Sequence, residues 1–311
     1  KLSHSVAAIV HGFNSFRRDV EIAGVILNKV GSVRHEQMLR TAIEPLGIKV
    51  FGAVMRDSGL ALPERHLGLV QAFEHPLMEQ FIDNAARKLG NAITIDDILD
   101  SLSDVHHKSS EPVAKIPPLG QRIAVAKDLA FSFIYPHLIE GWKEQGAEIS
   151  FFSPLSDKGP NDNCDGIFLP GGYPELHANA LSQADNFRQN MLRAGKRGVK
   201  IYGECGGYMT LGEGLIDADG TCHKMLGLLP IETSFSERKR NLGYRKLHLE
   251  NDFLGVTQLN AHEFHYSTEV KNTTKAPLFS AQDALGNELG TFGAQINNIA
   301  GSYMHIIDRT V

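Results

Sequence analysis

The sequence is poor in the residues and runs that mark several classes of protein. It has three cysteines, Cys164, Cys205 and Cys222, an odd number without C-x-x-C spacing, which argues against a disulfide framework or a zinc site. No apolar run approaches the roughly 20 residues that a membrane helix needs, and the N-terminus lacks a signal-peptide pattern. These absences predict a cytoplasmic protein with no membrane partner and no bound metal.

The chain also lacks an excess of positive charge. Its 31 Lys+Arg against 36 Asp+Glu give a net charge of -5, so we expect no nucleic-acid partner. With 42% hydrophobic and 22% charged residues, the composition is that of an ordinary globular protein. A length of 311 residues is typical of two domains.

The first hundred residues alternate between buried-strand and amphipathic-helix patterns, which favours parallel βαβ units. A change of character follows at 103–120, where Pro112, Pro117 and Pro118 interrupt a segment with little periodicity, as in an interdomain linker. We therefore expect a first domain at 1–102, a linker at 103–120 and a second domain at 121–311. Within the first domain we expect strands at 22–28 and 49–54 and helices at 34–46, 76–89 and 96–102.

A second α/β series follows the linker, and its short apolar strands predict a mostly parallel sheet. After Met225 the pattern loosens into shorter strand-like pieces. The expected strands are 122–126, 148–152, 166–169, 199–203, 244–249, 257–260 and 298–305, and the expected helices are 131–145 and 180–194.

A nucleophile turn is the most informative feature of this series. The apolar strand at 199–203 leads into Gly203-Glu204-Cys205-Gly206-Gly207 and then into a helical pattern. A nucleophile on a tight strand-to-helix turn needs small neighbours, and the following backbone amides then face the developing oxyanion. We interpret Cys205 as the nucleophile; the alternative is a buried structural thiol beside turn glycines.

Two further segments complete a candidate site. A Pro-Gly-Gly turn at Gly171 and Gly172 follows the strand at 166–169, and the ends of parallel strands line the crevice where ligands bind. His305, at the end of the last apolar strand, is the candidate base, with His177, His262 and His265 as competitors. The H-E-x-H spacing of His262 and His265 lacks the i, i+4 pair of a helical zinc site, and its alternation suggests a strand.

Together these segments resemble the class I, triad-type glutamine amidotransferases and, more narrowly, the cobyrinic acid a,c-diamide synthases. The resemblance rests on the Cys205 turn, Pro170-Gly-Gly-Tyr-Pro-Glu-Leu-His-Ala178 and the His305 strand. Further matches are 62–69, 124–135, 152–155, 242–245 and 262–267, so it covers nearly the whole chain.

The resemblance implies an α/β fold of two domains: a partial P-loop NTPase region, similar to dethiobiotin synthetase, followed by a flavodoxin-like amidotransferase domain. The second would hydrolyse glutamine with Cys205 and His305, and the first would use ATP and Mg²⁺ to activate the a- and c-acetate carboxylates of a corrinoid precursor. The substrate could be cobyrinic or hydrogenobyrinic acid, with a nickel tetrapyrrole also open. The implied oxyanion and glutamine contacts are Gly171, Gly172, Gly206 and Glu175; the corrinoid or interface candidates are Asp128, Tyr135, Glu263, His265 and Tyr266; the nucleotide-proximal candidates are Asn28 and Lys29.

The sequence departs from the resembled pattern at two places. No G-x-x-x-x-G-K-[ST] loop occurs in the 311 residues, and the chain starts at Lys1 in mid-pattern, so we expect the C-terminal part of a longer polypeptide whose preceding segment is a partner. Many class I enzymes have a Glu two residues after the catalytic His, where this chain has Ile307. We therefore expect a Cys/His dyad, helped by a backbone carbonyl or by a carboxylate such as Glu175 or Glu204.

Two other functions stay open: a stand-alone thiol hydrolase, and a non-catalytic relative that binds a partner or tetrapyrrole.

Overall fold

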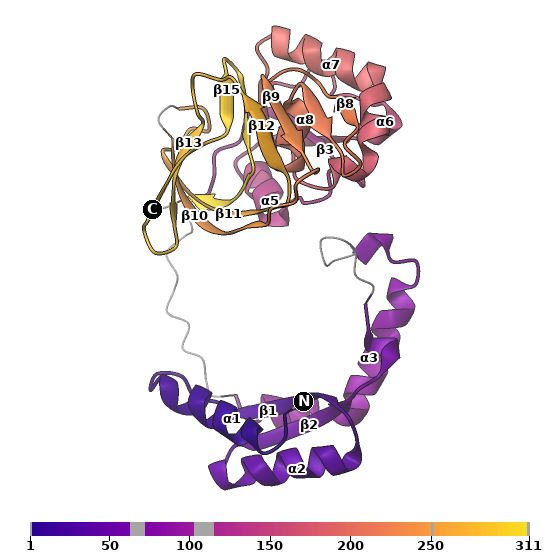
Figure 1. Cartoon of the computed structure of the whole chain (residues 1–311), viewed down its shortest axis with the longest axis vertical. Helices are drawn as coiled ribbons and strands as arrows, with labels where there is room; N and C mark the ends of the chain where they lie inside the picture. Colours follow the sequence, from indigo (N-terminus) through magenta and orange to yellow (C-terminus); the bar gives the residue numbers. More distant parts are fainter. Residues whose placement is uncertain (1, 63–71, 103–114, 250–251, 310–311) are drawn as a thin grey trace. The chain divides into compact units, whose positions relative to one another are not determined.

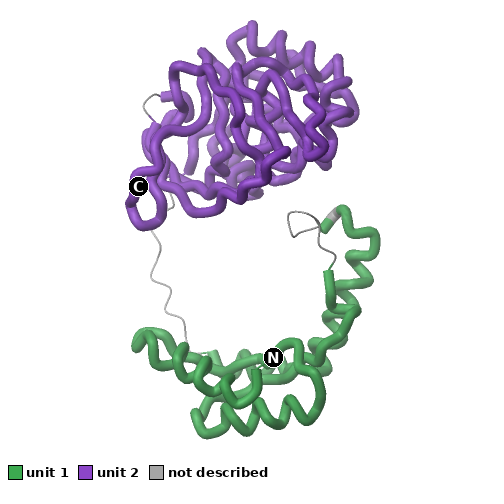
Figure 2. Tube along the Cα trace, in the orientation of Figure 1, with its two compact units in different colours: residues 1–110 green, residues 111–311 purple. Residues whose placement is uncertain are grey.

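The protein, described here by a computed structural model covering residues 2–62, 72–102, 115–249 and 252–309, divides into two compact units (Figure 2). Unit 1 is Lys1–Ser110 and unit 2 is Glu111–Val311. Most of the predicted linker, residues 103–114, lies outside the described residues, as does nearly all of the matching segment 62–69.

Unit 1 is built around two parallel strands, β1 (Gly24–Val30) and β2 (Lys49–Met55), joined by helix α2 (Val33–Ile43). The Ser32 hydroxyl caps α2 by accepting a hydrogen bond from the His35 amide at 3.2 Å. Helix α1 (Ser5–Phe16) adds Val6 and Val10 to a core formed with Leu27, Val30, Leu39, Ile43 and Ala53. Helices α3 (Met78–Ala92) and α4 (Ile95–Leu99) follow, so the expected helices and strands of this region are confirmed, with their bounds shifted by a few residues.

Unit 2, coloured from magenta to yellow in Figure 1, contains a six-stranded sheet in the order β15-β16-β6-β5-β3-β4. Every neighbouring pair is parallel except β15 with β16, which confirms the predicted mostly parallel sheet. The strands are β3 (Arg122–Ala126), β4 (Glu148–Phe152), β5 (Gly166–Leu169), β6 (Lys200–Glu204), β15 (Ala294–Ile296) and β16 (Ile299–Ser302).

Both faces of this sheet are buried because its strands alternate between two cores. In β3, Ile123 and Val125 enter one core, and Ala124 and Ala126 enter the other. Helices α6 (Ala178–Gln183), α7 (Asp185–Lys196) and α8 (Gly206–Leu211) pack on the alanine side. Helix α5 (Pro136–Glu144) packs on the other side, together with part of a second sheet. Burial on both faces explains why the strands read as continuous apolar runs.

Two more sheets complete unit 2, and the loosening pattern after Met225 did not predict their pairing. One has the order β14-β13-β10-β11-β17, antiparallel throughout, and the other has the order β12-β9-β7-β8. The first comprises β10 (Asn241–Leu249), β11 (Gln258–His265), β13 (Phe279–Asp283), β14 (Glu288–Phe292) and β17 (Met304–Arg309). The second comprises β7 (Gly214–Ile216), β8 (Cys222–Lys224), β9 (Ile231–Ser234) and β12 (Thr268–Asn272).

Two helix predictions were wrong in extent. The helix expected at 131–145 begins at Pro136, because the residue before a proline disfavours helical backbone, and Phe133 instead bridges to Gly171. The helix expected at 180–194 is two helices, since Ala184 leaves the helical conformation between α6 and α7.

Candidate functional site

Three neighbouring parallel strands bring the predicted site residues together. Strand β6 lies between β5 and β16, with Leu169 opposite Gly203 and Ser302 opposite Glu204. The chain leaves these three ends toward Gly171, Cys205 and His305. Parallel strands place their carboxyl ends at one edge of the sheet, which is where open α/β sheets bind ligands.

The Cys205 backbone is strained in the way a nucleophile turn requires. Cys205 has φ 45° and ψ -104°, a positive φ that few non-glycine residues adopt. Its amide donates a hydrogen bond to the Ser302 carbonyl at 2.8 Å, which ties the turn to β16. The side chain is buried, with Sγ 4.0 Å from the Phe264 carbonyl oxygen. Such strain persists where the surrounding structure holds it, most often at functional sites.

Gly171 lies between His305 and the tight turn at 203–207 that carries Cys205, which we call the elbow. A Cβ built on Gly171 would lie 2.4 Å from Cε1 of His305 and 3.3 Å from Cβ of Cys205. A Cβ built on Gly206 would lie 3.0 Å from the Gly172 amide nitrogen. The Pro-Gly-Gly turn, the elbow and His305 therefore pack in direct contact.

Aromatic rings fix the position of His305. The His262 ring stacks on it with centroids 4.8 Å apart and an interplanar angle of 6°, and the Phe133 ring lies 6.2 Å away. The Tyr135 hydroxyl bonds Nε2 of His262. Burial raises the pKa of Tyr135 to about 12, so this hydroxyl stays protonated.

Burial keeps the Cys205 thiol and the His305 imidazole neutral. It raises the pKa of the Cys205 thiol well above its usual value; the Glu175 and Glu204 carboxylates add to this, and the Gly206 amide opposes it. Burial, with smaller contributions from His262 and His265, lowers the pKa of His305 to about 3. Charge must therefore develop in this site during a reaction rather than before it.

Glu204, the last residue of β6, is a buried carboxyl that sequence reasoning named only as one possible helper of His305. Its Oε2 lies 3.9 Å from Nδ1 of His305, and its Oε1 accepts a hydrogen bond from the Ile306 amide at 3.1 Å. An acidic residue inside an apolar strand, directly before the nucleophile, was the available signal. The stacking role of His262 had no such signal, because it depends on the pairing of β11 with β17.

The other predicted residues lie in several places. Asp128 is bonded to the Ala130 and Leu155 amides and the Ser153 hydroxyl, so its carboxylate holds a loop. Tyr266 is half-buried, with its ring 5.8 Å from that of Phe264. In unit 1, Asn28 and Lys29 lie near the end of β1, where the Asn28 side chain accepts a hydrogen bond from the Lys29 amide at 2.8 Å.

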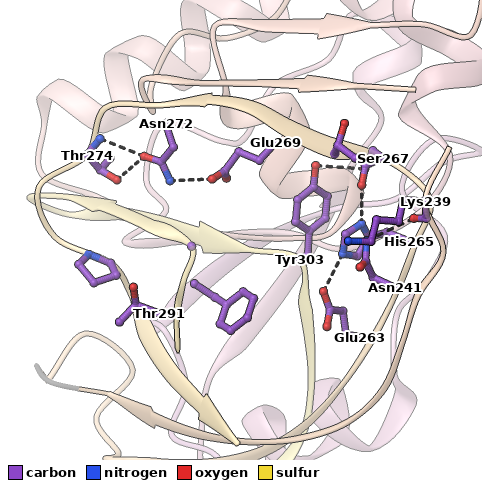
Figure 3. Close-up of a pocket in the computed structure, with 14 residues that line it drawn as sticks. Lys239, Asn241, Glu263, His265, Ser267, Glu269, Asn272, Thr274, Thr291 and Tyr303 are labelled. Atoms are coloured by element: carbon purple, nitrogen blue, oxygen red, sulfur yellow. Dashed lines mark hydrogen bonds and ion pairs between the residues drawn. The ribbon is translucent and has the colours of Figure 1, made fainter. Parts of the chain in front are cut away.

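Glu263 and His265 line a cavity of about 440 Å³ on the other side of β11 from His262 (Figure 3). Glu263 bonds Nε2 of His265 at 2.8 Å and Arg245 at 2.8 Å, and His265 stacks on Tyr303 with centroids 3.8 Å apart. Strand alternation explains the separation, since 263 and 265 point away from the face that carries 262. Lys239, Glu269 and Asn272 complete much of the polar lining.

Within the described residues, no group of three or more His, Cys, Asp or Glu side chains is placed to hold a metal ion. Across the same residues, the helices are too short or too polar to span a bilayer.

Family comparisons match both parts of the chain. Residues 122–310 match the CobB/CobQ-like glutamine amidotransferase domain, and residues 1–70 match the CobQ/CobB/MinD/ParA nucleotide binding domain.

Similar curated proteins share one name. The chain is 52% identical over 308 residues to hydrogenobyrinate a,c-diamide synthase of Rhizobium meliloti, covering 99% of this chain and 71% of that protein. It is 52% identical to the protein of the same name from Brucella anthropi, covering 98% of this chain and 70% of that protein. The protein of that name from Mesorhizobium japonicum is 44% identical, with 99% and 70% covered.

Solved structures give more distant matches. A glutamine amidotransferase from Thermotoga maritima has a TM-score of 0.40 at 15% identity, covering 59% of this chain and 75% of that one. PurLQS from Thermotoga maritima has a TM-score of 0.42 at 18% identity, with 60% and 87% covered.

Proposed function

This chain belongs to the hydrogenobyrinate a,c-diamide synthase family, and on that premise we propose that unit 2 hydrolyses glutamine to supply ammonia for amidation of a corrin. The acceptors would be the a- and c-acetate carboxylates, in cobalamin biosynthesis. The name shared by the similar proteins supports the metal-free acid, hydrogenobyrinate, over the cobalt-containing one. The observation that carries the proposal is the contact of the strained Cys205 turn with Gly171 and His305.

In the proposed first step, Sγ of Cys205 attacks the side-chain amide carbon of glutamine while His305 takes the thiol proton. His305 then returns that proton to the amide nitrogen, the C–N bond breaks, and ammonia leaves a glutamyl thioester. Because burial holds the thiol and the imidazole neutral, proton transfer accompanies the attack rather than preceding it.

In the second step, His305 takes a proton from water as it attacks the thioester, and the proton returns to sulfur when the C–S bond breaks. We propose that the amides of Gly172 and Gly206 stabilise the oxyanion of both steps, because the glycine turn and the elbow meet there. Because Gly171 has no side chain, the glycine turn can lie close enough to Cys205 for these amide contacts. Glu175 is the proposed partner for the glutamine ammonium group, and its effect on the pKa of Cys205 supports a position near the sulfur.

We propose that the two units are a synthetase region at 1–102 and an amidotransferase domain at 121–311, joined by 103–120, in an enzyme that uses ATP and Mg²⁺. The nucleotide-binding match supports the first assignment. Asn28 and Lys29 supply no phosphate-binding loop, and the sequence holds no G-x-x-x-x-G-K-[ST], so the residues present do not fit a complete nucleotide site. Tyr266 stays the proposed corrin or interface contact, since the side chains of Asp128, Tyr135, Glu263 and His265 already bond other protein groups.

Labelling with diazo-oxonorleucine, a glutamine analogue with an electrophilic carbon, tests the proposal. We expect one adduct per chain, on Cys205, with excess glutamine slowing its formation, as measured by peptide mass spectrometry. The chain contains its own controls, because Cys222 is exposed and Cys164 is buried. Iodoacetamide should modify Cys222, whereas the glutamine analogue should not.

An adduct confined to Cys222, or none on the folded chain, would contradict the proposal and favour a relative that only binds a partner or tetrapyrrole. Faster hydrolysis of a peptide panel than of glutamine would instead favour a thiol hydrolase.

Gly171→Ala should lower kcat for glutamine hydrolysis about 10²-fold, because an added methyl displaces the His305 ring from the elbow. The variant should still fold, since the atom in the way is the end of a side chain. Glutamate release measures the rate, and the fluorescence of Trp142, the one tryptophan, reports folding of unit 2. An unchanged kcat would show that His305 does not act from its present position.

A further inference from the structure

Two buried polar atoms face each other beside the nucleophile, and neither has a hydrogen-bond partner among the described residues. They are Oε2 of Glu204 and Nδ1 of His305, 3.9 Å apart. Glu204 is 1% exposed and His305 is 2% exposed, so solvent does not satisfy either atom. Leaving buried polar groups unpaired costs stability, and such groups mark places where function holds the arrangement.

The carboxyl is held in place by the strand that carries the histidine. Its other oxygen, Oε1, accepts a hydrogen bond from the Ile306 amide at 3.1 Å, and Ile306 follows His305 in β17. Residue 204 itself ends β6, directly before Cys205, and pairs in register with Ser302. One acidic side chain therefore links the backbone that carries the nucleophile to the backbone that carries the base.

Other nearby carboxylates have different partners. Asp308 accepts a hydrogen bond from the Asn260 side chain at 2.7 Å. Glu263 is bonded to His265 and Arg245 on the other face of β11. Within the described ranges, Glu204 is the one carboxylate that lies within 4.0 Å of a His305 nitrogen.

We propose that Glu204 is the positioning residue for His305: it accepts a hydrogen bond from Nδ1–H, leaves Nε2 free to take a proton, and stabilises the imidazolium that forms. This inference rests on the proposed function. The distance of 3.9 Å between Oε2 of Glu204 and Nδ1 of His305 is longer than a hydrogen bond. Catalytic hydrogen bonds are often long without substrate and shorten in the reacting complex. The role matches that of the acid in Cys and Ser triads, and here it comes from the residue before the nucleophile.

The proposal carries a pH dependence. Glu204 is surrounded by Tyr202 on its own strand, His305 and the Ile306 amide on β17, and more distantly Tyr135 and Cys205. Burial raises the pKa of Glu204 to about 8, with the Ile306 amide and Tyr202 opposing the rise. A protonated carboxyl no longer offsets the charge of the imidazolium, so kcat/KM for glutamine should rise with pH through about 8.

The test is glutamate release by Glu204→Gln between pH 6 and 10. We expect kcat to fall about 10²-fold or more, since the same acid-to-amide change in a Ser-His-Asp triad costs about 10⁴-fold. KM should change less than about threefold, because Glu204 acts through His305 and does not touch glutamine. The rise near pH 8 should disappear. Glu204→Asp should recover part of the rate and keep a rise with pH.

Asp308→Asn is the matched control, because Asp308 is a carboxylate on β17, the strand that carries His305, and is bonded to Asn260. This variant should keep the rate within about twofold. A Glu204→Gln enzyme that retains more than about a third of the rate and the rise near pH 8 would overturn the proposal. So would a loss of rate in Glu204→Gln with an unshifted pH profile, which indicates packing alone. If Glu204→Gln does not fold, the pH profile of Glu204→Asp decides, and an unshifted rise overturns the role. A Cys205→Ser chain as active as the wild type would instead refute the proposed function, and this inference with it.

Discussion

Cys205→Ser should reduce glutamate release from glutamine by at least about 10⁴-fold and leave the fold of unit 2 unchanged. A serine hydroxyl fits the space of the buried thiol, so packing against Phe264 and the glycine turn is kept. The hydroxyl is a much weaker nucleophile than the thiol, and its proton is harder to remove. Losing the nucleophile of a comparable triad costs about 10⁶-fold in kcat.

Cys222→Ser is the matched control, because Cys222 is exposed and lies on β8, outside the turn that carries Cys205. It should retain full activity. Assaying glutamate rather than an amidated product keeps free ammonia from masking the defect. Equal glutamate release by Cys205→Ser and the wild type would mean that another group performs the hydrolysis or that none occurs at this site.

Gly207→Ala should destabilise unit 2 by about 3–5 kcal/mol, the range of severe core defects. A Cβ at this position would lie 1.9 Å from the Leu169 carbonyl oxygen and 2.7 Å from Cβ of Leu169. The obstruction is backbone of β5, which is held on both sides by β3 and β6 and cannot rotate away. Helix α8 would have to leave the sheet, and the Cys205 turn would move with it.

Urea unfolding followed by Trp142 fluorescence measures this effect, because Trp142 is buried in unit 2 against Phe168. Gly141→Ala is the control in the same unit: its added Cβ meets nothing closer than Cδ of Lys115 at 3.9 Å. Inside helix α5 that change should stabilise the unit by about 0.5–1 kcal/mol. A midpoint for Gly207→Ala equal to that of the wild type would show that β5 and α8 can separate without cost.

The sequence by itself determined the parts of this protein whose signal is local. Short continuous apolar runs predicted β3 to β6, and small residues on both sides of Cys205 predicted a tight turn. The sequence required Gly203 and Gly207 only as small residues of the turn; the structure adds that a Cβ on Gly203 would lie 2.7 Å from Cδ1 of Leu211 and a Cβ on Gly207 1.9 Å from the Leu169 carbonyl oxygen. His305 was the candidate base because it follows an apolar strand, and the resemblance favoured it over three other histidines.

The tertiary structure decided how strands far apart in the sequence pair and in which register. Whether residue 204 or residue 308 faces His305 depends on the register of β16 on β6 and of β17 on β11, including a register shift at Asn260. Phe133, which was expected in the helix at 131–145, likewise forms a bridge with Gly171, 38 residues further along the chain. Local patterns fix which face of a strand is apolar, whereas the neighbours of a buried carboxyl depend on how strands far apart in sequence align.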